Sequence, residues 1–383
     1  MSLYKHLSHF PLKKGLITKQ AHVGLPENTF EDEHGRDGFF GPVSHLYRSH
    51  APILWNRIEG PLKPRAYDLN KTPKSLNKSK SEDGYHRSKL LYNEAVAIFT
   101  LKPNGAMPYY YRNADGDEVY FIHQGSGTIE TDYGPLTFEP GDYLVIPKGT
   151  TYRWCPATPE NFFLLIESRD RIRQPDRGIL GQHALYDPAV IQTPEPSPIL
   201  EESSQENPKE WEVRIQRLNE ITKVFYPFNP MDVVGWKGDL TVWKLNVRDI
   251  RPVMSHRYHL APSVHSTFIG GDAFIICTFL PRPLEEDENA VRVPFYHRNI
   301  DYDEVIFYHD GDFFSRHGIA PGMLTLHPQG IHHGPHPKAV AASLKKTKTD
   351  EIAVMIDSRQ ALLASPEATA CEWADYHISW CEH

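Results

Sequence analysis

An internal repeat constrains the fold of this chain more than any other feature of its 383 residues. The segment Tyr111-Arg-Asn-Ala-Asp-Gly-Asp-Glu118 matches His297-Arg-Asn-Ile-Asp-Tyr-Asp-Glu304, and a Pro-Gly turn recurs behind each copy, at Pro140-Gly141 and at Pro321-Gly322. A glycine follows each glutamate at the same spacing, and the copies close with similar motifs at residues 166–169 and 356–359. Because these matches occur in the same order, we expect two copies of one structural unit.

The residues between the turns indicate that this unit is built from strands. Short runs rich in Val, Ile, Phe, Tyr and Thr, such as EVYFIHQG, GDYLVIPKG and EVIFYHDG, lie between frequent prolines and glycines, which number 32 and 25. Such a pattern is typical of a β-sandwich or barrel. Residues 358–377 are the best helical segment, and we expect it to be interrupted near Pro366. The sequence therefore predicts a fold dominated by β-structure, with an irregular N-terminal segment and a short C-terminal helix.

The repeat and the composition divide the chain into four parts. We expect an irregular, partly β segment packed on the barrels (1–90), a first barrel (91–190), a connection (191–225) and a second barrel that carries the C-terminal helix (226–383). The polar stretch 71–84 is predicted to be an exposed loop, and the proline-rich, acidic stretch 190–210 a surface connection.

The bulk composition excludes several classes of protein. A net charge of -8 disfavours nucleic-acid binding, which requires a basic surface. No apolar run approaches the roughly 20 residues that span a bilayer, and the N-terminus lacks the apolar core of a signal peptide. The four cysteines form no CxxC motif. We therefore expect a cytoplasmic protein that binds neither nucleic acid nor membrane.

The second copy of the repeat contains residues suited to bind a metal ion. Of the 21 histidines, seven lie between residues 297 and 336. His297 and Glu304 are followed by the turn Pro328-x-Gly330 and then by His333, so that neighbouring strands could bring two imidazoles and one carboxylate into one cavity. This set is typical of Fe(II) oxygenases and leaves positions open for substrate and O₂. Asp303 competes with Glu304 as the ligand, and His332 competes with His333; His327 and His336 are expected near the site without binding the metal.

The first copy lacks this ligand set. Tyr111 stands where the second copy has His297, and Tyr152 stands where it has His333, although Glu118 is retained. A single carboxylate cannot hold iron, so we expect the first barrel to be structural and the chain to bind one iron, in the second barrel.

The paired motifs resemble those of the cupins, whose fold is a jelly-roll β-barrel with ligands lining its interior. The chain further resembles the homogentisate 1,2-dioxygenases, on residues spread over most of its length: Leu46-Tyr47-Arg48, Asp115-Gly116-Asp117, Pro227-Phe228-Asn229, Val234-Gly235-Trp236, Pro294-Phe295-Tyr296-His297-Arg298-Asn299 and His333-Gly334-Pro335. The resemblance implies two cupin barrels, Fe(II) as the cofactor, homogentisate and O₂ as substrates, maleylacetoacetate as the product and a role in tyrosine and phenylalanine catabolism. It also implies a homotrimer or homohexamer.

The resemblance assigns further residues around the metal. His259 matches the acid–base histidine of the family, with His256 and His265 as nearby competitors. Tyr296, Arg316 and His333 are expected to contact the substrate, and Arg316 would bind its carboxylate where the family has a lysine. The alternatives are a cupin dioxygenase for another hydroxylated ring, such as gentisate or a hydroquinone, a metal-dependent isomerase, and a non-catalytic metal-binding bicupin.

Overall fold

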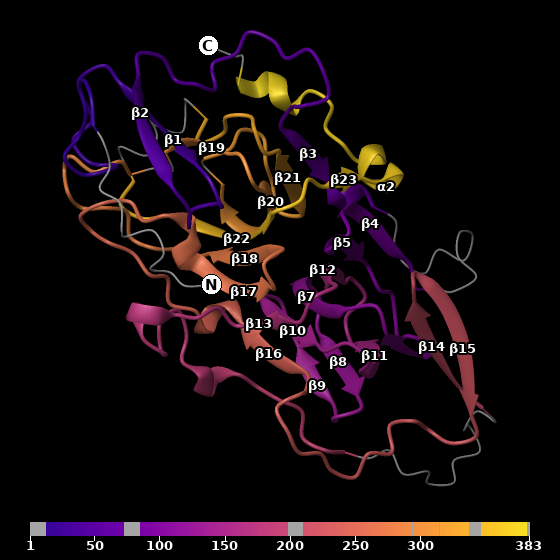
Figure 1. The fold of residues 1–383 in the computed structure, drawn as a ribbon. Coiled ribbons are helices and arrows are strands. Elements are labelled where there is room, and N and C mark those ends of the chain that lie inside the picture. The colour runs from indigo at the N-terminus through magenta and orange to yellow at the C-terminus, as the bar shows by residue number, and fades with distance from the viewer. Residues whose placement is uncertain are drawn as a thin grey trace.

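The computed structural model describes residues 13–72, 85–197, 210–292, 295–313, 315–336 and 346–380. Most of them form two β-barrels that lie side by side (Figure 1). This architecture confirms the predicted all-β class and the pair of cupin barrels. Part of the predicted loop at 71–84 and part of the predicted connection at 190–210 fall outside the described residues.

The first barrel consists of two sheets that enclose an apolar core. One sheet runs in the order β16 (Trp243–Asn246), β10 (Asp142–Ile146), β7 (Asp117–Gln124), β12 (Phe162–Ser168), β5 (Val96–Leu101), β4 (Arg87–Tyr92), β23 (Leu363–Ala364). The other runs β15 (Glu220–Tyr226), β14 (Trp211–Arg217), β6 (Tyr110–Asn113), β11 (Thr151–Pro156), β8 (Gly127–Thr131), β9 (Leu136–Phe138). Aromatic and aliphatic side chains fill the space between them, among them Phe99, Tyr120, Phe138, Trp154 and Phe163.

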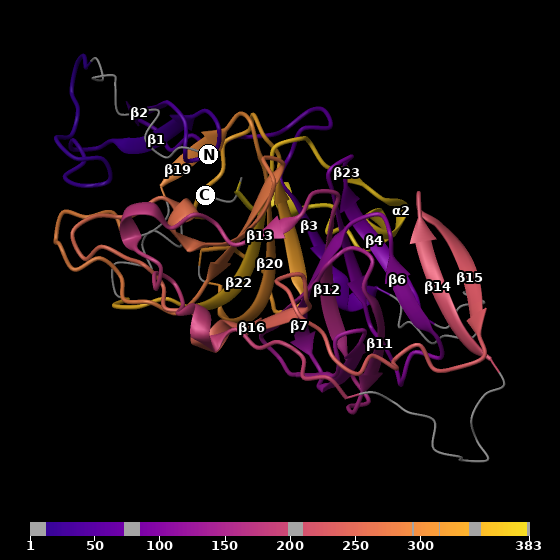
Figure 2. The same cartoon turned by 60° about the horizontal axis from the view of Figure 1, so that its bottom comes forward.

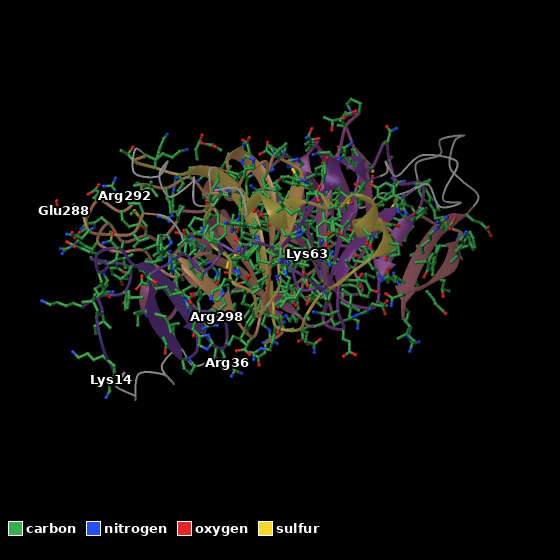
Figure 3. All side chains as sticks on the ribbon, turned by 90° about the horizontal axis from the view of Figure 1, so that it is seen from above. Lys14, Arg36, Lys63, Glu288, Arg292 and Arg298 are labelled. Atoms are coloured by element: carbon green, nitrogen blue, oxygen red, sulfur yellow. The ribbon has the colours of Figure 1, made fainter. Side chains whose placement is uncertain are left out.

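The second barrel has one large and one small sheet. The large sheet runs β13 (Ile172–Arg173), β17 (Ser266–Gly270), β18 (Phe274–Phe279), β22 (Asp350–Ser358), β20 (Asp303–Asp312), β21 (Met323–His327), β3 (Arg65–Asp68). The small sheet runs β19 (Tyr296–Asn299), β1 (Phe30–Gly35), β2 (Val43–Arg48). In Figure 3, which looks from above, Arg298 lies on β19 of this small sheet and Arg36 just after β1, while Glu288 and Arg292 lie at the end of the second barrel that is farther from the first.

Short helices connect these strands. In the described ranges they are α2 (Pro366–Ala370) and the 3-10 helices η1 (Leu69–Lys71), η2 (Gly178–Leu180), η3 (Pro188–Val190), η4 (Val247–Asp249), η5 (Pro262–His265) and η6 (Tyr376–Trp380). Within those ranges, no helix is long and apolar enough to cross a membrane.

The two barrels pack against each other through equivalent strands of the repeat. His123 on β7 and His309 on β20 are 186 residues apart, and their Nδ1 atoms lie 2.8 Å from each other. Burial lowers the pKa of His123 to about 3 and that of His309 to about 4, so both rings are neutral and one can donate to the other. Phe121 and Phe307 meet beside them at the same repeat offset. The internal repeat is therefore an approximate two-fold relation between the barrels.

Strands also cross the predicted part boundaries. From the N-terminal segment, β1 pairs in parallel with β19 and β3 pairs with β21, whereas β23 from the C-terminal part pairs with β4 of the first barrel. The division into four parts stays a prediction. In the structure, the hydrogen bonds of these strand pairs join the predicted parts to one another.

The predicted connection 191–225 includes β14 and all but the last residue of β15, two strands of the first barrel. Strands β14 and β15 form a hairpin at the edge of that barrel, well away from β1 and β2 (Figure 2). Leu218 and Asn219 make the turn, both with positive φ, which is the geometry of a tight two-residue hairpin. The prolines and acidic residues just before this hairpin suggested a connection, but the alternating apolar residues Trp211, Val213 and Ile215 favour a strand.

The C-terminal helix is shorter than predicted. Within 358–377, residues 363–364 are a strand, and α2 begins at Pro366. The Ser365 side chain accepts a hydrogen bond from the backbone N–H of Ala368, which caps the helix. Proline therefore begins this helix instead of interrupting it, because the first helical position needs no N–H partner.

An ion pair occupies the place in the first barrel that corresponds to the metal centre predicted for the second. Tyr111 and Tyr152 are directly opposite each other on β6 and β11. Arg87 donates to Glu118 at 2.7 Å, and the Tyr152 hydroxyl donates to the other oxygen of that carboxylate at 2.6 Å. The Arg87 guanidinium also lies over the Tyr111 ring. The positive charge that this buried glutamate requires is thus supplied by a side chain.

We expect Arg87→Met to destabilise the protein by about 3–5 kcal/mol, because Glu118 would remain as an uncompensated buried charge. Chemical denaturation measures this change. The double variant Arg87→Met/Glu118→Gln should recover most of the loss. Arg57→Met, which removes the exposed partner of Glu59, serves as the control and should change stability little. Equal stability of Arg87→Met and Arg57→Met would contradict a structural role for the buried pair.

Candidate metal centre

Two histidines of the second barrel are held together by their backbones. His297 lies on β19, and its N–H donates to the carbonyl of His333 at 2.9 Å; the N–H of His333 donates back to the carbonyl of His297 at the same distance. Side chains of directly opposed residues leave a sheet on the same face. The two imidazoles consequently lie together, with ring centroids 4.1 Å apart.

Glu304 completes the group from β20. Its Oε2 atom lies 3.9 Å from Nε2 of His297 and 3.6 Å from Nε2 of His333. The three residues are buried, and their ligand atoms all lie within 4.8 Å of one another. They form one of two groups in the described part of the chain that could hold a metal ion. The structure therefore brings together the three predicted ligands.

The protonation states of these groups suit a cation. Burial, followed by the charge of His333, lowers the pKa of His297 to about 3, so its ring is neutral and offers a lone pair. Burial alone raises the pKa of Glu304, but His333 and His327 outweigh it and hold the pKa well below its ordinary value. His327, opposite Glu304 on β21, makes a hydrogen-bond contact with the second carboxylate oxygen at 2.7 Å. An anionic carboxylate oriented by a neighbour is typical of metal sites.

The competing ligands are engaged elsewhere. Asp303 accepts hydrogen bonds from the backbone N–H groups of Gln329 and Leu362, which fixes the turns at the end of the barrel. His332 contacts Asp32 of β1 at 3.1 Å. His336 contacts the Ser379 carbonyl. The geometry thus favours Glu304 over Asp303 and His333 over His332.

A cavity borders the metal group, and His259 lies in its wall. Its lining includes His259, His265, Arg282, Arg292, His297, Glu304, Tyr308 and Arg316. Nδ1 of His259 lies 2.9 Å from Glu285, which fixes the ring and leaves Nε2 to face other partners. His265 also lines the cavity, but burial lowers its pKa to about 3. His256 is exposed and outside the lining.

Arg316 lies inside this cavity and not on the surface. Its guanidinium donates to the carbonyl of Gly334 at 2.6 Å and lies 3.8 Å from Glu304. Its Nε is buried without a hydrogen-bond partner among the described residues. Arg282 and Arg292 line the same cavity, although no sequence motif singles them out. The cavity is therefore suited to an anionic ligand.

Tyr296 is not brought into the cavity. It precedes His297 on β19 and so leaves the sheet on the opposite face. There it packs in an apolar cluster with Ala51, Ile53, Ala66, Tyr376 and Trp380. Strand alternation accounts for the difference from the expected substrate contact: a residue next to a ligand in a regular strand faces away from the metal.

Comparison with known families agrees with this geometry. The family model "Homogentisate 1,2-dioxygenase N-terminal" matches residues 86–247, and "Homogentisate 1,2-dioxygenase C-terminal" matches residues 259–382. The chain belongs to the homogentisate 1,2-dioxygenase family. It is therefore a cupin of a ring-cleaving dioxygenase family whose members are metalloenzymes. The first match includes β14, β15 and β16, which are also strands of the two sheets of the first barrel.

Individual relatives cover most of the chain. A protein of Saccharolobus solfataricus that is named as a candidate dioxygenase is 32% identical over 99% of both chains. The homogentisate 1,2-dioxygenase of Pseudomonas savastanoi pv. phaseolicola is 28% identical over 75% of this chain and 68% of its own. Among solved structures, an oxalate decarboxylase mutant from Bacillus subtilis matches 80% of both chains at 11% identity, with a TM-score of 0.37.

We expect His333→Ala to lose one metal equivalent per chain, because two ligands bind a divalent ion far less tightly than three. Elemental analysis of protein purified without oxygen measures the loss. Tyr152→Phe, the matched change at the equivalent position of the first barrel, should keep the full metal content. Full metal retention in His333→Ala would exclude this residue as a ligand.

Proposed function

We propose that this protein is an Fe(II)-dependent dioxygenase that converts homogentisate and O₂ to maleylacetoacetate. The observation that supports it best is one cavity that borders a two-histidine, one-carboxylate group and is also lined by a histidine oriented by a carboxylate and by a buried arginine with an unpartnered donor. We further propose that the protein acts in tyrosine and phenylalanine catabolism and that it assembles as a homotrimer or homohexamer.

The residues present fit an iron ion. Nε2 of His333 is buried and has no hydrogen-bond partner within the described residues, although it points toward Glu304. Such an atom is costly unless something binds its lone pair. His297, Glu304 and His333 would hold the ion, and two imidazoles with one carboxylate are the ligands of non-haem Fe(II) oxygenases. When bound, iron supplies O₂ activation beside the aromatic substrate.

His259 is proposed to take the proton of a substrate hydroxyl at its Nε2 atom. Its Nδ1 atom is paired with Glu285, so the ring is positioned and Glu285 stabilises the charge that develops. Burial is the largest influence on its pKa and lowers it, while Glu285 opposes that shift. His259 is therefore neutral near pH 7 and able to accept a proton.

Arg316 is proposed to bind the substrate's carboxylate. A planar guanidinium can present parallel N–H groups to a carboxylate, and a buried pairing of this kind is worth more than a surface one. This role favours homogentisate over an unsubstituted or methylated hydroquinone. Gentisate also has a carboxylate, so it is the strongest alternative substrate; it differs in placing this group directly on the ring.

The central test is anaerobic reconstitution with Fe(II), followed by measurement of O₂ uptake with homogentisate, gentisate and methylhydroquinone in parallel. Homogentisate should give the highest kcat/KM. A higher kcat/KM for gentisate would change the substrate and keep the class of enzyme. Absence of O₂ uptake with every substrate, at full iron content, would support the isomerase or the non-catalytic bicupin instead.

We expect His259→Asn to keep its iron and to slow ring cleavage by about 10²–10⁴, the usual contribution of a positioned acid–base group. Because the base must be neutral and its pKa is lowered, wild-type kcat/KM should fall only as pH drops below the ordinary histidine value of 6.5. This acidic limb should be missing in the variant. A variant that turns over at the wild-type rate would exclude the role; His256→Asn, at an exposed position, is the control.

We expect Arg316→Met to raise KM for homogentisate by about tenfold or more, because a charged hydrogen bond contributes roughly 1.5–3 kcal/mol. Methylhydroquinone, which has no carboxylate, should be affected much less. Arg292→Met provides the comparison, since this arginine lines the same cavity. A selective loss with Arg292→Met in place of Arg316→Met would move the anchor to Arg292, and equal losses for both substrates would contradict an anchoring role.

A further inference from the structure

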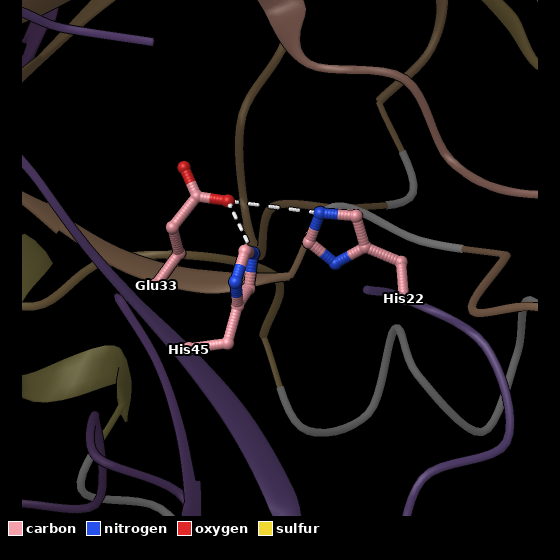
Figure 4. A group of neighbouring side chains, drawn as sticks. All are labelled: His22, Glu33 and His45. Atoms are coloured by element: carbon pink, nitrogen blue, oxygen red, sulfur yellow. Dashed lines mark hydrogen bonds and ion pairs between the residues drawn. The ribbon is translucent and has the colours of Figure 1, made fainter. Parts of the chain in front are cut away.

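A second group of metal-type ligands lies outside the barrel cavity, on the N-terminal segment. It consists of His22 in the loop before β1, Glu33 on β1 and His45 on β2. Glu33 and His45 are directly opposite each other in the antiparallel pair. Figure 4 shows both imidazoles turned toward the same carboxylate. Three residues with lone-pair atoms from three separate segments therefore meet at one point.

The spacing of these atoms fits a coordinated cation. Oε2 of Glu33 lies 3.0 Å from Nε2 of His45 and 3.6 Å from Nε2 of His22. All ligand atoms of the group lie within 4.8 Å of one another. Bonds of about 2.0–2.2 Å to a tetrahedral zinc ion place ligand atoms roughly 3.3 Å apart. The contacts to Glu33 are as close as those in the His297, Glu304 and His333 group.

A second carboxylate orients His22. The Nδ1 atom of His22 lies 2.8 Å from Glu31, and its backbone N–H donates to the same carboxylate at 3.0 Å. A hydrogen bond at Nδ1 places the proton there and leaves the lone pair of Nε2 directed at Glu33. A carboxylate behind a histidine is the usual support for a metal-binding imidazole.

The negative charges of two buried carboxylates, Glu31 and Glu33, also favour a bound cation at this group. The side chains of Glu31 and Glu33 are 1% and 10% exposed. Among the described residues, their ion-pair partners are His22 and His45, with no lysine or arginine. The Tyr47 hydroxyl also donates to Glu31 at 3.2 Å, but it carries no charge, so these two buried carboxylates require positive charge from elsewhere or from protons on the rings. A divalent ion supplies that charge while both rings stay neutral.

The group of His22, Glu33 and His45 is accessible from a cavity that is also lined by His259. This cavity is lined by His22, Glu33, His45, Tyr258, His259 and residues near Gly38, so an ion has a path of entry and an open coordination position. His22 stacks on Phe295 with centroids 4.1 Å apart and lies 6.4 Å from the ring of His259. An ion here would fix the N-terminal segment against the wall that carries His259.

We propose that His22, Glu33 and His45 form a second metal site that binds a divalent cation of the zinc class, with Glu31 as its positioning residue. Two histidines and a glutamate are a recognised zinc ligand set. Fe(II) accepts the same ligands, so the test includes both ions.

The first experiment counts metal ions on the full-length protein after chelator treatment, equilibration with excess Zn²⁺ or, separately and without oxygen, Fe(II), and desalting. Wild type should retain two equivalents of Zn²⁺ per chain. His45→Ala and His333→Ala should each retain one, and the double variant none. The single equivalent in His45→Ala also shows that this variant is folded. His50→Ala, on the same segment but outside the group, should retain two.

Equal metal content of His45→Ala and wild type, whether one or two equivalents, would overturn the second site, whereas one equivalent in wild type and none in His45→Ala would place the failure at the barrel site. Two equivalents of Fe(II) but not of Zn²⁺ would keep the site and overturn the zinc assignment. These counts do not depend on ring cleavage, so the proposed function and the second site can fail separately.

A second experiment tests the positioning residue. Glu31→Gln keeps all three ligands and should weaken Zn²⁺ binding at this site by about 10–100-fold in a chelator competition. Affinity at the barrel site should be unchanged. Equal affinity of Glu31→Gln and wild type would contradict the assignment of Glu31.

Discussion

The reciprocal backbone hydrogen bonds between His297 and His333 are the constraint on which the barrel site depends. These backbone bonds alone place the two imidazoles side by side. Glu304 then completes the group from β20 of the large sheet. The first barrel uses the same arrangement for Tyr111 and Tyr152. The backbone thus provides two equivalent positions in each barrel, and the side chains at those positions decide what the barrel can bind.

A buried glutamate at the same point of both barrels explains why their chemistry differs. Each carboxylate is removed from water and needs a compensating positive charge. Glu118 receives it from Arg87, whose guanidinium lies 2.7 Å from the carboxylate. Glu304 is faced mainly by imidazoles, with one guanidinium 3.8 Å away, and a metal ion is the remaining source of charge at its Oε2 atom. Tyr111 and Tyr152 thus stand in the first barrel where the second has His297 and His333, and among the described residues only the second barrel has a group that could hold a metal ion.

Sequence reasoning predicted the features that repeat and missed those that depend on distant contacts. The two barrels, the ligand group and the tyrosines of the first barrel all follow from residues at matched spacings. Asp117 and Asp303 even make equivalent hydrogen bonds, each accepting from the residue after the Ile-Pro or His-Pro pair of its own copy. Arg292 has no motif and reaches the cavity only through the fold. Tyr296 was misplaced because neighbouring residues in a strand face opposite sides.

The second metal group shows most clearly why some sites are invisible in a sequence. Glu33 and His45 are close in the chain, but nothing in the motif indicates that His22 returns to them. In the structure, Glu33 pairs with His45 on one side and with His297 on the other, because β1 lies between β2 and β19.

The bridge to His333 extends this row, so that His45, Glu33, His297 and His333 follow one another across four neighbouring segments. Directly paired residues share a face of the sheet. The two metal groups are therefore linked through directly paired residues of neighbouring strands, which lie about 4.8 Å apart. Any shift of β1 relative to β19 would move Glu33 and disturb His297 at the same time. The N-terminal segment therefore belongs to the architecture of the candidate metal centre, although its residues lie far from the repeat in sequence.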